Sequence, residues 1–361
     1  MVRYLSYVSR LCASVSSTMD TPPFLTLPAE IHHLILFKYD TTASDVLNTV
    51  LSCKHLYAVV LGRVGEENAY DVAQLRAKAG VMMCIRNGWE RAACLAVKRG
   101  HGDPSDADDD DGPLVLTVAV EKGMETLVRT LLADPRVDPS AECEEALSMA
   151  CSKGNVAIIS LLLADPRVDP SVNQSEAIQM AAQAGHVDAT TVLLSDPRIN
   201  PGADNNYPIR AACEHGYLDV ARLLLADSRV DPSAENNEAI ATAAERGHTD
   251  IVSLLLTDPR VNPGDQDNLA IVNASAEGHI EIVKLLLPHP DVDPVVSCAI
   301  GAASVKGQVE VVRLLMSDPR VDPSDMNNIA LVLAAHAGHS DVIELLRTDP
   351  RVGTVTPPST S

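Results

Sequence analysis

The sequence predicts an all-α protein in which short helix pairs stack into a solenoid. A leucine run that ends in Asp-Pro recurs along the chain, as in LLLADPRVDP from residue 161. Aromatic residues are 3% of the chain and hydrophobic residues 46%, so the core must consist of thin layers of Leu, Val, Ile and Ala. Glycines recur every 31 residues, apart from one step of 29, at Gly123, Gly154, Gly185, Gly216, Gly247, Gly278, Gly307 and Gly338. A repeat of this length is typical of a solenoid.

Each repeat is predicted to hold two helices joined at the glycine. A small apolar segment precedes the glycine, as in IATAAERG from residue 240, and HTDIVSLLL from residue 248 has apolar residues at helical spacing. Glycine ends the first helix because it adopts positive φ at little cost. The second helix begins with an acidic residue, which favours the positive end of the helix dipole.

The Asp-Pro-Arg element is predicted to end the second helix, because proline lacks an N–H and disfavours helical geometry before it. The apolar residue after the arginine, such as Val168, should point into the core, and the next Asp-Pro or Asn-Pro should form a turn. We expect the arginines to form a surface ladder with neighbouring aspartates. Ten residues before the glycine stands a polar residue expected to cap the first helix: Ser175, Asn206, Asn237, Asn268, Ser297 or Asn328.

These repeats resemble ankyrin repeats. The stretch EAIATAAERGHTDIVSLLL (238–256) is similar to the family pattern TPLHLAAxxGHxxVVxLLL, and the resemblance covers residues 113–351 as eight repeats. The period is two residues shorter than the family's 33, and Thr-Pro-Leu-His survives best as Tyr207-Pro208-Ile209-Arg210. We therefore expect short fingers, the loops between repeats, with little β-hairpin. The 29-residue step predicts a nearly deleted finger at Pro294–Ser297.

The segment 24–62 lies outside the repeat register and resembles an F-box, with Leu27-Pro28 and Glu30 at its start and a Leu-x-Cys-Lys block at 51–54. The resemblance implies a three-helix bundle that docks a Skp-family adaptor. The residues implied in docking are Leu27, Pro28, Glu30, Ile31, Leu34 and Ile35. Alternatively, the bundle is only a cap on the N-terminal end of the solenoid.

The domain prediction places this F-box-like bundle at residues 24–65. Residues 1–20 are expected to be a disordered leader. Residues 1–18 could instead be a targeting segment or untranslated, since Met19 begins a sensible sequence. Residues 66–112 are a divergent first repeat, containing NGWERAACLAV from residue 87, and an acidic loop. Eight repeats follow at 113–351, and residues 352–361 are expected to be a disordered tail.

Charge and cysteine usage limit the partners. The net charge is −21; residues 1–100 hold 11 Lys/Arg and 8 Asp/Glu, and the remainder hold 17 and 41. Such an acidic array repels phosphate groups, so we expect no nucleic-acid or membrane partner. The eight cysteines include no CxxC pair, which fits a reduced cytoplasmic or nuclear protein. We expect a monomer.

No catalytic or metal-binding motif is expected. The recurring Gly-His histidines, such as His248 and His279, belong to successive layers roughly 10 Å apart and cannot converge on one ion. The run 106–111 lacks the glycine and the glutamate of a calcium loop, because Asp111 and Thr117 occupy those positions. No phosphate loop or nucleophile elbow occurs, so neither an enzyme nor a cofactor is predicted.

The resemblances imply a substrate receptor of a cullin–RING ubiquitin ligase, with the head on the adaptor and the ankyrin groove on a target protein. The alternative is an ankyrin scaffold or sequestering protein whose head is a cap. An acidic groove predicts a basic target, although the charge could instead serve only solubility. The groove residues predicted to contact the target are Gln179, Gln183, Asn205, Arg210, Glu214, His215, Glu235, Asn236, Glu245, Arg246 and Asp265. Ala241 is likewise expected to be free of packing contacts.

Overall fold

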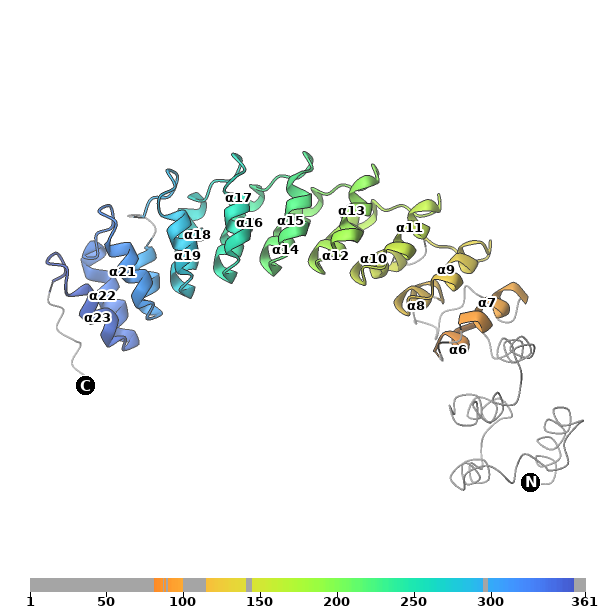
Figure 1. Cartoon of the computed structure of the whole chain (residues 1–361), viewed down its shortest axis with the longest axis horizontal. Helices are drawn as coiled ribbons and strands as arrows, with labels where there is room; N and C mark the ends of the chain where they lie inside the picture. Colours follow the sequence, from red (N-terminus) through yellow and green to blue (C-terminus); the bar gives the residue numbers. More distant parts are fainter. Residues whose placement is uncertain are drawn as a thin grey trace, which may run out of the picture. The chain divides into compact units, whose positions relative to one another are not determined.

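The computed structural model describes residues 81–86, 88, 90–99, 115–140, 145–294 and 298–353 (Figure 1). The chain forms two compact units, Met1–Val115 and Leu116–Ser361. All regular structure in the described residues is helical, and these residues contain no strand, as the all-α prediction required. The predicted leader and F-box-like head, the acidic run 106–111 and the tail beyond residue 353 lie outside the described residues.

The described part of the first unit contains α6 (Val81–Arg86) and α7 (Glu90–Arg99). Gly88 lies between them with φ +71°, so the glycine turn and second helix predicted for NGWERAACLAV are present. The two helices contact each other, and Cys84, Ile85 and Ala93 are buried. This pair therefore has the helix–glycine–helix order of the later repeats.

The second unit is built from helix pairs in chain order. The first helices of the pairs are α8 (Val115–Glu121), α10 (Glu145–Ser152), α12 (Val172–Gln183), α14 (Ala203–His215), α16 (Ala234–Arg246), α18 (Asp265–Glu277), α20 (Ala299–Val305) and α22 (Asp325–Ala337). The second helices are α9 (Glu125–Leu132), α11 (Val156–Ala164), α13 (Val187–Ser195), α15 (Leu218–Leu225), α17 (Thr249–Leu255), α19 (Ile280–Leu286), α21 (Val309–Met316) and α23 (Ser340–Leu346).

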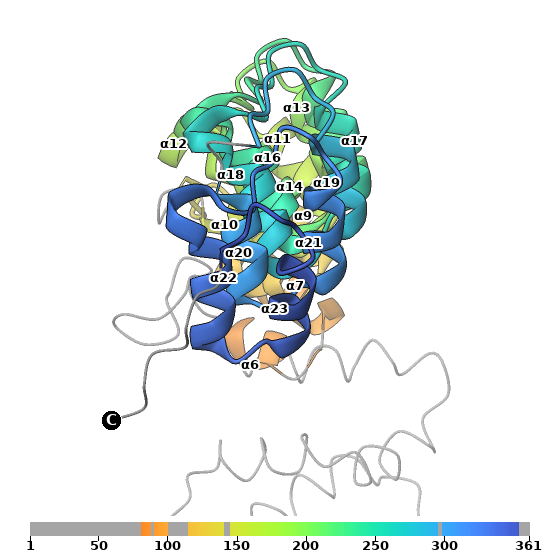
Figure 2. The same cartoon turned by 90° about the vertical axis from the view of Figure 1, so that its left-hand side faces the viewer.

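The helices form two layers, because first helices pack on first helices and second helices on second helices (Figure 2). The interior of the α16–α17 pair shows how each layer is built. Ile240, Ala243 and Ala244 of the first helix and Ile251 and Leu255 of the second are buried. Burying a leucine or isoleucine side chain contributes roughly 1.5–3 kcal/mol, so each repeat depends on its neighbours to cover its apolar faces.

The glycines end the first helices in the left-handed conformation that the sequence predicted. Gly216, Gly247 and Gly278 all have φ +81°. A β-carbon at Gly247 would also lie 2.6 Å from Cε1 of His279, a residue of the next repeat. Glycine is thus required both for the helix end and for the approach of the following repeat.

The predicted capping role is wrong for those Ser and Asn residues that the structure describes. Asn237 does not cap its own helix; it ends a left-handed turn in which Glu235, Asn236 and Asn237 have φ of 52°, 56° and 62°. Its Oδ1 accepts a hydrogen bond from the N–H of Asn262 in the next finger, at 2.8 Å. The same bond joins Ser175 to Asn200, Asn206 to Asp231, Asn268 to Asp293 and Asn328 to Gly353.

The geometry of the turn explains this difference. The N–H of Asn237 donates to the carbonyl of Ser233 at 2.9 Å, which closes the turn locally. The side chain is therefore free to satisfy a donor of the neighbouring repeat. Asparagine tolerates left-handed φ better than most residues, which suits it to this position. Ser297, the remaining predicted cap, lies outside the described residues.

Candidate functional site

The arginines of the Asp-Pro-Arg elements join successive repeats. The guanidinium of Arg167 binds the carboxylate of Asp165 through Nε at 2.9 Å and Nη2 at 2.6 Å. The same group donates from Nη1 to the carbonyl of Val137 and from Nη2 to that of Leu132, both at 2.8 Å. Leu132 ends α9, so its carbonyl lacks a helical partner and gains one here. The predicted ladder exists, but its links between repeats run through carbonyls.

Five further arginines repeat this bridging. Each binds the aspartate two residues earlier and a carbonyl of the preceding repeat: Arg198, Arg229, Arg260, Arg320 and Arg351. Hydrogen bonds from Arg167 lower the pKa of Asp165, and burial opposes this shift less strongly. The same pairing raises the pKa of Arg167. Each pair therefore stays fully ionised at neutral pH.

Histidines form a second set of links between repeats. His248 lies against Gly216 of the preceding repeat, and its Nε2–H donates to the carbonyl of Glu214 at 3.0 Å. His186, His279 and His339 make the equivalent bond to Ser152, Glu245 and Val305. Within the described residues, His, Cys, Asp and Glu side chains form no group of three or more that could hold a metal ion. The repeated Gly-His pairs thus have a structural role.

The surface formed by the left-handed turns and by the exposed side chains of the first helices, here called the finger face, is acidic. Its turns 204–206, 235–237, 266–268 and 326–328 contain exposed carboxylates at Asp204, Glu235 and Asp267. Three cations of the first-helix layer already have carboxylate partners on neighbouring repeats. Arg210 pairs with Glu238, Arg246 with Glu214 and Lys306 with Glu277. Each of these cations neutralises its own partner, and none of these partners is a carboxylate of the turns.

A family described as ankyrin repeats (3 copies) matches residues 116–209, 147–236, 209–298 and 271–354. These matches together span more than half of the chain. The chain is an ankyrin-repeat protein. Among solved structures, the crystal structure of the human ASB11 ankyrin repeat domain is similar at 22% identity and a TM-score of 0.48. That similarity covers 58% of this chain and 99% of the other. No curated protein matches. Ankyrin repeats bind protein partners and are in general non-enzymatic scaffolds.

The ankyrin array displays the predicted groove residues to different extents. Gln179 is buried, and its Nε2 donates to the carbonyl of Gln174 in its own turn at 2.9 Å. Arg210 is half-buried, with its guanidinium 5.8 Å from the centre of the Tyr207 ring. Asn205, His215, Glu235, Asn236, Glu245 and Arg246 are exposed, whereas Gln183, Glu214 and Asp265 are half-buried.

Several of these side chains are engaged within the array. Asp265 accepts hydrogen bonds from Nδ2 of Asn237 at 2.5 Å and Nδ2 of Asn262 at 2.8 Å. His215 stacks on Tyr217 with ring centres 5.9 Å apart. Ala241, also expected to be free of packing, is buried against neighbouring helices. The turns contain further exposed polar groups that the sequence reasoning missed, Asp204 and Asp267, although these stand two residues and one residue before the recurrent Asn206 and Asn268.

The predicted adaptor-binding residues Leu27, Pro28, Glu30, Ile31, Leu34 and Ile35 lie outside the described residues. None of the described helices has the length and hydropathy needed to cross a membrane. Burial raises the pKa of the Cys213 thiol to about 12, so this thiol is a poor nucleophile at neutral pH. The arrangement supports recognition of another protein by charge and shape.

Proposed function

We propose that this ankyrin-repeat protein is the substrate receptor of a cullin–RING ubiquitin ligase. In this proposal residues 24–65 dock a Skp-family adaptor, and the repeats of 113–351 hold a target protein for ubiquitin transfer by other subunits. The observation that carries the target-binding half is the acidic finger face, whose nearby cations are already paired within the array. The protein itself performs no chemistry, requires no cofactor and works as a monomer in the cytoplasm or nucleus.

Charge complementarity supports a basic target. Exposed carboxylates recur from one turn to the next, as at Asp204, Glu235 and Asp267. A row of like charges attracts a partner of opposite charge and accelerates its association, with an effect that salt reduces. The same row disfavours nucleic acid and anionic membranes.

The adaptor-binding half is supported by the F-box resemblance, with Leu27-Pro28 at its start and Cys53-Lys54 at its end. The alternative function is an ankyrin scaffold or sequestering protein whose head only caps the array. Both functions use the finger face, so only adaptor binding separates them.

Co-expression of the full chain with the host's Skp-family adaptor, followed by size-exclusion chromatography, tests the proposal. We expect a stable one-to-one complex. A Leu27→Ala, Pro28→Ala double variant should elute apart from the adaptor while its thermal unfolding changes little. Separate elution of the unaltered chain would sink the receptor function. A large loss of stability in the double variant would favour the cap.

A charge-reversal pair tests the target-binding half. Glu235→Lys with Asp267→Lys changes two exposed residues of the finger face, and Asp219→Lys with Asp250→Lys makes the same charge change on second helices. The probe is a lysine-rich peptide. We expect the first variant to bind it more weakly than the unaltered chain and with less dependence on salt. The second variant should lose clearly less affinity and less salt dependence. Equal losses in the two variants would show that net charge alone governs binding.

A further inference from the structure

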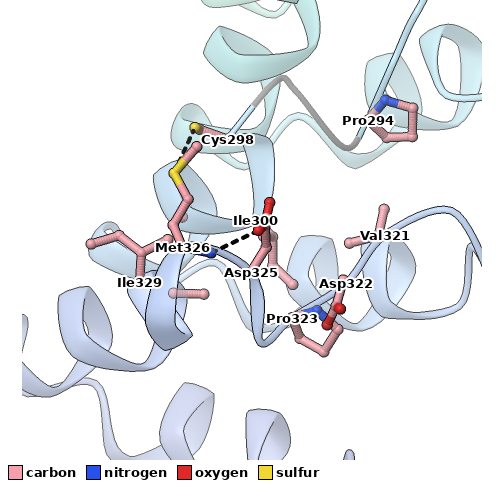
Figure 3. Close-up of a pocket in the computed structure, with 11 residues that line it drawn as sticks. Pro294, Cys298, Ile300, Val321, Asp322, Pro323, Asp325, Met326 and Ile329 are labelled. Atoms are coloured by element: carbon pink, nitrogen blue, oxygen red, sulfur yellow. Dashed lines mark hydrogen bonds between the residues drawn. The ribbon is translucent and has the colours of Figure 1, made fainter. Parts of the chain in front are cut away.

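A small apolar pocket, here called the notch, lies between the repeats of α20 and α22 (Figure 3). Two of its residues, Pro294 and Cys298, come from the segment before α20, within the 29-residue step from Gly278 to Gly307. Residues 295–297 lie outside the described residues and form no part of the notch as defined here. The apolar residues that define it are Pro294, Cys298, Ile300, Val321, Met326 and Ile329.

The residue at the mouth of the notch departs from the register of the other repeats. Met326 opens the left-handed turn of its repeat, a position held elsewhere by Asn173, Asp204, Glu235 or Gln266. Met326 is 54% exposed, the largest fraction among the exposed large hydrophobic residues in the part of the chain that the structure describes. A polar residue would suit this exposure better, so the methionine marks an apolar spot in a polar rim.

A second departure lies beside it. Cys298 is exposed and left-handed, with φ +51°, whereas the residues at the same register in other repeats, such as Glu238 and Leu269, are not. The Cys298 thiol contacts Sδ of Met326 at 4.0 Å (Figure 3). Beneath them Ile300 and Val321 are buried. The notch therefore has an apolar floor and a polarizable sulfur edge, which accommodates side chains of different shapes.

The charged groups of the notch are carboxylates. Asp322 and Asp325 line it, and its lining includes no cation among the described residues. Asp322 accepts from Ser324 and lies 3.9 Å from Arg351, so its charge is partly offset. Asp325 is exposed, and its Oδ1 accepts the N–H of Met326 at 2.8 Å. An occupant should thus be apolar where it enters and positively charged beside the entry point.

We propose that one leucine or methionine side chain from an extended segment of the target packs against the exposed Met326 and Cys298 at the mouth of the notch, with lysine or arginine residues on either side. This inference rests on the proposed target-binding function of the finger face and adds an anchor to it. Acidic turns recur along the array, so charge alone would let a basic segment slide from repeat to repeat. Met326 stands where the other described turns begin with a polar residue, so the notch sets the register. Such an anchor adds specificity to a charge-driven encounter.

The test uses the full chain labelled with ¹³C at its methionine methyl groups. The probes are eleven-residue lysine-rich peptides with a central leucine, a central alanine, or a central leucine flanked by glutamate. Fluorescence anisotropy measures affinity, and the Met326 methyl resonance, assigned by its loss in Met326→Gln, reports contact. We expect the leucine peptide to bind about tenfold more tightly than the alanine peptide and to shift the Met326 resonance. The glutamate-flanked peptide should not bind.

Two variants complete the design. Met326→Gln restores the kind of residue found at Gln266 and should abolish the leucine preference while thermal unfolding stays unchanged. Leu285→Gln removes an exposed apolar side chain from α19, outside the notch, and should keep the preference. An equal loss of the leucine preference in both variants would indicate general apolar adhesion and overturn the proposal that the notch anchors the target.

The remaining outcomes separate the two proposals. Equal affinity for the leucine and alanine peptides, with an unshifted Met326 resonance, would overturn the notch and leave charge-driven binding intact. No binding of any lysine-rich peptide would overturn both the notch and the acidic target face. The adaptor half would then still be decided by co-elution.

Discussion

Replacing Gly247 with alanine tests how closely neighbouring repeats must approach. The backbone there has φ +81°, which costs an alanine about 1 kcal/mol. The new β-carbon would lie 2.6 Å from Cε1 and 2.9 Å from Nδ1 of His279. The imidazole must therefore move, which breaks its 2.9 Å bond to the carbonyl of Glu245. That loss adds about 1 kcal/mol, and disturbed packing adds more. We expect a total of about 2–3 kcal/mol.

Gly338 offers a matched control. Its φ is +79°, but no atom lies within 4 Å of a β-carbon built there. Gly338→Ala should therefore show only the conformational cost of about 1 kcal/mol. Gly247→Val should cost more than Gly247→Ala, because a β-branched side chain resists positive φ still further.

Urea unfolding followed by far-UV circular dichroism measures these differences, provided that the slope of free energy against urea is the same for each variant. A double-mutant cycle isolates the contact: in a His279→Ala background, Gly247→Ala should cost only about 1 kcal/mol. Equal costs at Gly247 and Gly338, or no coupling to His279, would refute the inferred clash.

Three further outcomes are expected. Arg198→Lys keeps the charge but loses the planar fork and should destabilise the array by about 1–3 kcal/mol in urea unfolding, whereas Arg222→Lys, on an exposed part of α15, should change little. Asn237→Ala should lower the free energy of unfolding by about 2 kcal/mol, and Asn237→Gly should lower it less. Both variants lose the hydrogen bond to the next finger, but glycine adopts the positive φ without strain. Equal losses in the two variants would contradict a strained turn. Hydrogen bonds from arginine lower the folded-state pKa of five aspartates below the unfolded value: Asp165, Asp196, Asp227, Asp258 and Asp318. Acid titration followed by circular dichroism should therefore show that their contribution to stability is fully present above about pH 4 and is lost as pH falls further. An array whose stability does not change in this acid range would show that the Asp–Arg pairs add no stability.

Local chemistry made much of the fold predictable. Gly247 follows a small apolar segment, and only glycine readily takes the φ that ends the helix there. Asp-Pro ends each second helix because proline cannot continue it. The burial of Val168 and Ile199 also followed from their place between two turn elements. Each of these inferences needs only residues within a few positions of one another.

The site was less predictable, because side chains that look free in one repeat are used by the next. Gln179 and Ala241 occupy the expected outer positions of their helices, yet both are buried in the assembled array. Nothing in the local sequence marks Met326 as a contact residue. Only the structure brings Cys298 of the preceding repeat beside this exposed methionine.

The amino-acid sequence by itself determined the repeat, its helix pairs and the family, because periodic apolar residues and turn residues act over short distances. Tertiary structure decided which polar groups join the repeats. Asn237 could have capped its own helix by the ordinary rule, but the left-handed turn carries its amide to Asn262, 25 residues away. Arg198 likewise reaches carbonyls 30 and 35 residues earlier. Such bonds depend on the stacking distance between repeats, which exists only after the layers have packed.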